Sequence, residues 1–214
     1  MRRLTHLILS PTSRLVRLML GEKRIACDPM PAEDPLGHLP VLRELNGTVI
    51  VGLWAIIDHL ENEHPERPLL PAEPAERAEA LRLFDWAMNN FHEETTKRIV
   101  FEKGSQTQTG SLNRRPPNME TVRLGRQALA TALPALGTLA ETRGFLAGRD
   151  VSLADLAVAA HLSALDYFGE VPWTEQVALT EWYSRMKSRP SFRPLLSDRV
   201  PGQPPVSHYA ELDF

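Results

Sequence analysis

Cysteine is almost absent from this chain of 214 residues, in which Cys27 is the only one. A single cysteine excludes a disulfide framework and any zinc site built from several cysteines. No apolar run reaches the about 18 residues that a membrane-spanning helix requires. Ser10 and Pro11 interrupt the first apolar stretch before it attains the roughly 7–15 residues of a secretory signal. These absences predict a soluble cytoplasmic protein.

Basic surfaces and ligand motifs are also scarce. The formal net charge is −3 at pH 7, which argues against a strongly basic nucleic-acid-binding protein. The glycine-rich motifs that bind nucleotide phosphates are missing. His92, Glu93 and Glu94 are successive, so on a helix they would point to different sides and could not share a metal. We therefore expect no metal site and no nucleic-acid partner.

The first 63 residues have the pattern of a small α/β domain. Leu15, Leu18 and Met19 recur at helical spacing, with Arg14 and Arg17 on the other side of the predicted helix. Asn46-Gly47 between two apolar runs is typical of a tight β-hairpin. The predicted order is a strand, a helix, a strand, a hairpin of two strands and a helix, at residues 4–9, 13–20, 24–27, 41–44 with 48–51, and 54–60.

A proline-rich linker at residues 64–74 precedes an almost wholly helical region at 75–196. The predicted helices span residues 75–103, 119–143, 152–167 and 174–188, with a polar loop at 104–118 and a short segment at 192–196. Pro134 is expected to kink the second helix, and Ser152 with Asp155 forms an acidic capping box at the start of the third. Residues 197–214 are rich in proline and predict an extended tail.

Four stretches resemble the glutathione S-transferase family. They are SPTSRLVRLML at 10–20, HLPVL at 38–42, FLAGRDVSLADLAVAAHL at 145–162 and EWYSRMKSRPSFRPLL at 181–196. They are similar to the first strand-to-helix turn, the cis-proline turn, the helix-capping segment and the closing helices of that family. The resemblance implies a thioredoxin-like α/β domain at residues 1–63 and an all-helical domain at 75–196.

An enzyme of this family activates glutathione sulfur as a thiolate, which a hydroxyl at the start of the first helix stabilises. Ser10, Thr12 and Ser13 are the candidates here, although the same residues suit an ordinary helix N-cap. The backbone of Leu39, beside Pro40, would pair with the cysteinyl group, although this turn can equally be architectural. A glutathione transferase that uses one of these hydroxyls is therefore the alternative function.

The first departure from the family follows the fourth strand. Glutathione-binding members have an acid and a serine here, which hold the γ-glutamyl group. The corresponding pair is Gly52-Leu53, which offers neither a charge nor a hydroxyl. Losing one charge-assisted hydrogen bond costs about 1.5–3 kcal/mol, so losing two weakens binding by roughly two to four powers of ten. We expect Leu39, Pro40, Gly52 and Leu53 to form a vestigial site without a glutathione cofactor.

The second departure is the end of the tail. Tyr209, Leu212 and Phe214 are interleaved with Glu211 and Asp213. Aromatic and leucine anchors among acids are typical of a peptide that docks on a basic or apolar groove. The alternative is a strap that packs on its own domain.

This end also resembles the FzlA-type proteins of alphaproteobacteria, which have the transferase fold and bind the division GTPase FtsZ. The resemblance rests on HYAELDF after the proline-rich stretch and implies partner contacts at Glu211, Leu212, Asp213 and Phe214. It further implies a non-catalytic homodimer that binds FtsZ filaments at the division site, favours curved bundles and promotes septal wall synthesis. A scaffold for another partner stays open, because fold does not determine function.

Overall fold

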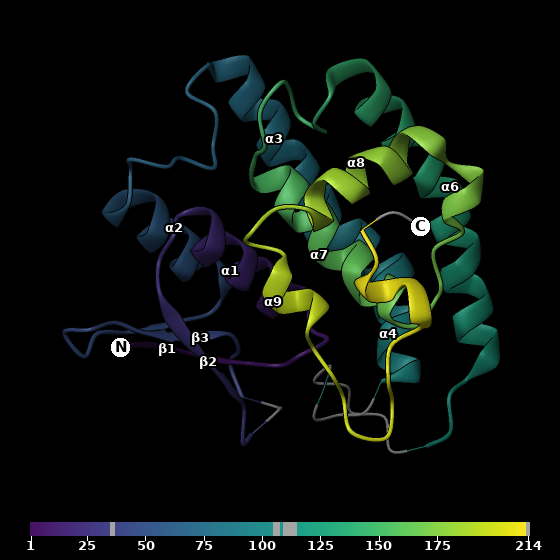
Figure 1. The fold of residues 1–214 in the computed structure, drawn as a ribbon, viewed down its shortest axis with the longest axis horizontal. Coiled ribbons are helices and arrows are strands. Elements are labelled where there is room, and N and C mark those ends of the chain that lie inside the picture. Colours follow the sequence, from purple (N-terminus) through teal and green to yellow (C-terminus); the bar gives the residue numbers. More distant parts are fainter. Residues whose placement is uncertain (35–36, 105–107, 109–114, 213–214) are drawn as a thin grey trace.

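The computed structural model describes residues 1–34, 37–104, 108 and 115–212 (Figure 1). The first part comprises β1 (Arg2–His6), α1 (Pro11–Glu22), β2 (Cys27–Pro31), β3 (Val41–Arg43), β4 (Val49–Val51) and α2 (Leu53–Glu63). The second part comprises α3 (Pro74–Trp86), the π-helix η1 (Ala87–Thr96), α4 (Lys97–Lys103), α6 (Met119–Arg143), α7 (Leu153–Tyr167), the 3₁₀ turn η2 (Trp173–Glu175), α8 (Val177–Lys187), α9 (Arg193–Leu196) and the 3₁₀ turn η3 (Ser207–Ala210). No described helix has both the length and the apolar character needed to cross a membrane.

The sheet has the strand order β2-β1-β3-β4, with β1 parallel to β2 and antiparallel to β3. Its inward residues include Leu4 and Leu42, which face each other across β1 and β3 and are buried. Figure 1 shows α1 and α2 on the same side of this sheet. The predicted fold class, a thioredoxin-like domain followed by an all-helical domain, is confirmed.

The second strand begins later than predicted, at Cys27 instead of residue 24. Arg24 has a φ of 56°, and the amide of Ile25 still donates to the carbonyl of Leu20, so the chain is turning out of α1 there. Pro29 and Pro31 fall inside β2, beyond residue 27, where the predicted strand ends. Both fit because β2 lies at the edge of the sheet and needs no amide on its outer side.

The predicted helix at 75–103 is continuous but not uniform, because ten of its residues form the π-helix η1. Helix α6 spans the predicted residues 119–143 and is capped by Asn118, whose side chain accepts from the amides of Glu120 and Thr121. Helix α7 is buried along its whole length, and at its start the amide of Ser152 donates to Asp155, as the capping box predicts. The predicted polar loop at 104–118 lies largely outside the described residues.

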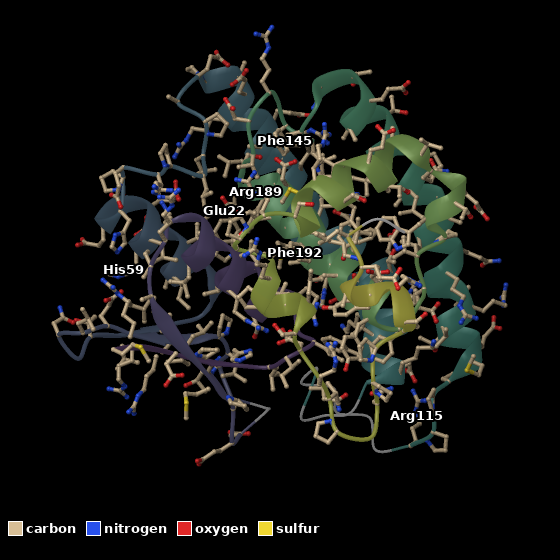
Figure 2. The ribbon with its side chains drawn as sticks, viewed as in Figure 1. Glu22, His59, Arg115, Phe145, Arg189 and Phe192 are labelled. Carbon is tan, nitrogen blue, oxygen red and sulfur yellow. The ribbon has the colours of Figure 1, made fainter. Side chains whose placement is uncertain are left out.

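The two domains are joined by an ion pair at the far end of α1. Glu22 accepts from the Nε and Nη2 atoms of Arg189 at 2.6 and 2.7 Å, and Figure 2 shows the two side chains meeting near Phe192. Arg189 lies between α8 and α9, so the pair fixes α1 against the closing helices. Hydrogen bonding to Arg189 and Ser191 outweighs burial and lowers the pKa of Glu22.

Candidate functional site

The turn before α1 holds the three predicted hydroxyl groups, and each has a partner within the chain. The Ser10 and Thr12 hydroxyls lie 2.8 Å apart and hydrogen bond to each other. Ser13 is buried, and its Oγ accepts from the amide of Leu7 at 3.1 Å. Ser10 occupies the N-cap position of α1 but makes no side-chain capping bond. These hydroxyls therefore already have intramolecular structural bonds.

The backbone amide of Leu9, at the same turn, also has a hydrogen-bond partner within the chain. The amide of Leu9 donates at 2.9 Å to the carbonyl of Gln108, a buried residue from the segment after α4. This bond ties the turn before α1 to a residue of the second part of the chain. Cys27 offers no substitute nucleophile, because burial raises the pKa of its thiol to about 11 and so disfavours the thiolate.

The predicted vestigial glutathione positions come together at the start of α2. The Leu39–Pro40 peptide is cis, and the carbonyl of Pro40 accepts from the amide of Gly52 at 3.0 Å. Gly52 has a φ of 90° and is the N-cap of α2, whose first residue is Leu53. The first turn of α2 has no acidic residue and no side-chain cap. The cis-proline turn and the start of α2 are thus joined by a backbone hydrogen bond between Pro40 and Gly52, and the vestigial glutathione site stays a prediction.

The tail is held against the helical domain by the side chain of Tyr209. Tyr209 is 0% exposed, its hydroxyl donates to the carbonyl of Leu195 at 2.9 Å, and its ring packs edge-on against Tyr167. The expectation that Tyr209 contacts a partner needs correction, because burial leaves its side chain no exposed surface in this conformation. The predicted extended tail is a strap, ending in the turn η3, from residue 198 to residue 210.

Arg14 is the main polar contact beneath this strap. Its Nη1 donates to the hydroxyls of Tyr209 and Ser163 at 2.9 and 2.8 Å, and its Nε donates to the carbonyl of Ile8. Asp198, at the start of the strap, lies 3.4 Å from its Nη2 and also pairs with Arg17 at 2.8 Å. Burial alone would lower the pKa of Arg14, but Tyr209 and Asp198 outweigh burial and raise it.

A second polar cluster holds the strap near η3. The buried carboxylate of Asp166 accepts from Nε1 of Trp173 at 2.8 Å and lies 3.2 Å from Nε2 of His208. Lys187 lies 4.0 Å from Asp166 and donates to the carbonyl of His208. Burial raises the pKa of the Asp166 carboxyl and lowers that of the Lys187 ammonium.

The chain leaves this anchored region after η3. Glu211 is exposed, and Leu212 is 44% exposed although it is a large apolar residue. Asp213 and Phe214, the other predicted contacts, lie outside the described residues. The described part of the end therefore presents one carboxylate and one leucine to solvent, directly after a fixed turn.

Sequence reasoning missed the polar residues under the strap. Helical periodicity places Arg14 on the polar side of α1, yet Arg14 is fully buried. Its partners are 184 and 195 residues away in the sequence, so local spacing carries no signal of the contact. Within the described ranges, no group of three or more histidine, cysteine, aspartate or glutamate side chains is placed to hold a metal.

Comparisons with known proteins agree with this geometry. The family models "Glutathione S-transferase, N-terminal domain" and "Glutathione S-transferase, C-terminal domain" match residues 4–68 and 111–190. FtsZ-localized protein A of Caulobacter vibrioides is 44% identical over 100% of this chain and 98% of its own.

Solved structures cover the whole chain as well. FzlA from C. crescentus has a TM-score of 0.92 at 44% identity, with 100% of this chain and 99% of that chain covered. A glutathione S-transferase from Rhodospirillum rubrum F11 has a TM-score of 0.93 at 40% identity, with both chains fully covered. On these matches, over both halves and over the full length, the chain belongs to the glutathione S-transferase superfamily and, within it, to the FzlA-type proteins.

Proposed function

We propose that this protein is a non-catalytic member of the superfamily that binds FtsZ filaments through its C-terminal end and thereby regulates bacterial cell division. The observation that carries the proposal is the anchored strap, which ends in the exposed residues Glu211 and Leu212. The relative that aligns over the full length is named for its localization with FtsZ. In this role the protein is cytoplasmic, gathers at the division site, and favours filament curvature and bundling that promote septal wall synthesis.

The state of the transferase cleft supports a binding role over a catalytic one. Ser10, Thr12 and Ser13 have partners within the chain, and the amide of Leu9 is bonded to Gln108. Gly52 provides no carboxylate for a γ-glutamyl ammonium. We propose that no glutathione cofactor is used, and titration calorimetry should give no binding with a dissociation constant below about 1 mM, where binding free energy is near 4 kcal/mol.

The exposed end has the chemistry of a short recognition peptide. A leucine supplies apolar area, and a neighbouring carboxylate restricts the partner to a groove with a basic rim. By sequence, Asp213 and Phe214 extend the same alternation of acid and apolar side chain. We infer that residues 211–214 form the contact and that Tyr209 holds them in place.

Co-sedimentation with FtsZ polymers in GTP tests this proposal. The full chain should pellet with the polymers, whereas a variant ending at Ala210 should stay in the supernatant with an unchanged melting temperature. Leu212→Ala should weaken binding, while Leu45→Ala, at a comparably exposed leucine in the β3–β4 turn, should not. A full chain that remains in the supernatant while FtsZ pellets would show that the proposal is wrong.

We also propose that the protein acts as a homodimer. Val49, Val51 and Trp54 are exposed on β4 and at the start of α2. A groove of about 680 Å³ between α3 and α6 is lined by residues that include Trp86 and Leu139. These exposed apolar side chains support a contact surface between two copies of the chain.

Sedimentation equilibrium should give twice the monomer mass. Val51→Asp should give the monomer mass, because a buried unpaired carboxylate is costly. Val177→Asp, at an exposed valine on α8 outside this surface, is the matched control and should stay dimeric. A wild-type chain with the monomer mass at micromolar concentration would contradict dimerisation.

A further inference from the structure

We propose that Arg14 is a positioning residue for the partner-binding end, acting through Tyr209 to fix where the chain leaves the helical domain after Ala210. This inference rests on the proposed function, because it assigns a role to the same C-terminal end. It places the control of that end on α1, the helix that in the family begins the glutathione site.

Arg14 has the contacts expected of a buried cation that holds segments together. It is 0% exposed and donates to acceptors on the turn before α1, on α7, at the start of the strap and near its end. A buried charge is tolerated only when it is paired and hydrogen bonded. Asp198 supplies the negative charge, so strap and arginine stabilise one another.

The hydroxyl of Tyr209 transmits this contact to the end of the chain. It accepts from Arg14 and donates to the carbonyl of Leu195, so both of its hydrogen-bonding roles are used. The guanidinium carbon lies 6.0 Å from the Tyr167 ring centre and 5.9 Å from that of Tyr209. The orientation of Tyr209 is therefore set by bonds at its tip as well as by packing.

The short distance along the chain from Tyr209 limits the positions that Leu212 can occupy. Leu212 is three residues after Tyr209, so an extended backbone spans at most about 11 Å between their Cα atoms. The turn η3 shortens this further, because the amide of Glu211 donates to the carbonyl of His208. An anchored end loses less conformational entropy on binding than a free one, which raises its affinity without any new contact.

The planar guanidinium is required for this arrangement. Its N–H groups donate hydrogen bonds in different directions, to Ile8, Ser163, Tyr209 and Asp198. A lysine ammonium is instead a single point of charge on a flexible side chain. Other bonds, such as that from Lys187 to His208, still hold the strap when the Arg14–Tyr209 bond is lost. Removing the bond should therefore loosen the end without unfolding the domain.

Two variants test the inference, Tyr209→Phe and Arg14→Lys, each in the full chain. A spin label on Ala210→Cys, in a Cys27→Ser background, reports the mobility of the end in a part of the tail outside the proposed contact. Both variants should make the label more mobile and weaken binding to FtsZ polymers by roughly 3- to 10-fold, equivalent to about 0.6–1.4 kcal/mol. The double variant should weaken binding by less than the sum of the two single effects, because both variants remove the shared Arg14–Tyr209 bond.

Thr96→Val is the control, since it removes another buried hydroxyl, one that hydrogen bonds to His161 instead of to Arg14 or the strap. It should change neither label mobility nor binding. The inference is overturned if the label in Tyr209→Phe and Arg14→Lys stays as immobile as in the parent, or if both variants bind FtsZ with full affinity despite a mobile label. Failure of the proposed function looks different, because the unmodified chain would then not bind FtsZ while label mobility would still respond.

Discussion

The turn that begins α1 and the C-terminal strap lie against the same helix, yet their polar groups are used differently. In the turn, the hydroxyls of Ser10, Thr12 and Ser13 are bonded within the first domain. Under the strap, Arg14 and Arg17 reach from α1 to residues near the other end of the chain. A helix that serves a small-molecule site in its superfamily is here a docking site for the protein's own tail.

The largest expected effect is at the strap. Tyr209→Ala should cost about 3–5 kcal/mol of unfolding free energy, because it removes a buried aromatic ring and leaves Arg14 with one partner fewer. For a domain of this size the melting temperature should fall by roughly 8–15 °C in calorimetry. Leu212→Ala should melt like the wild type, since its side chain is exposed. Equal melting temperatures for the wild type, Tyr209→Ala and Leu212→Ala would show that Tyr209 does not stabilise the fold.

Acid should weaken the first domain through His6, at the end of β1. Burial, and then the nearby Arg17, lower its pKa from 6.5 to about 4. The unfolded chain therefore binds a proton between pH 6.5 and 4 that the folded chain does not, and stability falls as the pH falls through this window. Between pH 7.5 and 5 this loss should be about 2 kcal/mol in urea unfolding.

The matched substitutions are His6→Asn and His38→Asn. The first should flatten the dependence of unfolding free energy on pH, whereas the second, at an exposed histidine, should leave it as in the wild type. An unchanged slope in His6→Asn would show that His6 is not the group responsible.

A smaller effect on unfolding free energy should show whether the Ser13 hydroxyl, in the turn before α1, has a structural or a catalytic role. Ser13→Ala leaves the buried amide of Leu7 without its acceptor and should cost about 1–3 kcal/mol, measured by urea unfolding. Ser197→Ala removes an exposed serine hydroxyl and should stay within about 0.5 kcal/mol of the wild type. A glutathione-conjugating activity lost in Ser13→Ala would instead favour the transferase alternative.

The smallest effect is expected at the start of α2. Gly52→Ala places a side chain at a φ of 90° and should cost about 1–2 kcal/mol through backbone strain alone, since nothing lies within 4 Å of the added Cβ. Gly148→Ala, where the new atom makes ordinary contacts, should be neutral or slightly stabilising in thermal unfolding. Equal stability of both variants would mean that glycine is not required at the cleft.

Sequence reasoning succeeded where the signal is local. The helix predicted at 119–143 has those bounds, Asn46-Gly47 joins β3 and β4, and Ser152 with Asp155 opens α7. It failed where distant residues decide the outcome. Arg14 is buried and hydrogen bonded to Asp198 and Tyr209, which lie near the other end of the chain. The helical spacing of apolar residues in α1 carries no information about these distant contacts.

The π-helix η1 also escaped prediction, for a physical reason. Its ten residues lie within one continuous helix, so their apolar spacing does not distinguish i→i+5 from i→i+4 bonding. For the candidate site, the sequence already showed that the start of α2 at Gly52-Leu53 has no acidic residue, and that the end of the chain alternates acidic and apolar residues. The division of the tail into an anchored strap and an exposed end was not.

The pairing of Arg14 with Asp198 has a consequence for biosynthesis. The two residues are 184 positions apart in the sequence, so the ribosome adds Arg14 to the growing chain long before it adds Asp198. Until then the first domain holds a cation whose folded environment lacks its counter-charge. A chain that ends before residue 198 cannot form this ion pair at all.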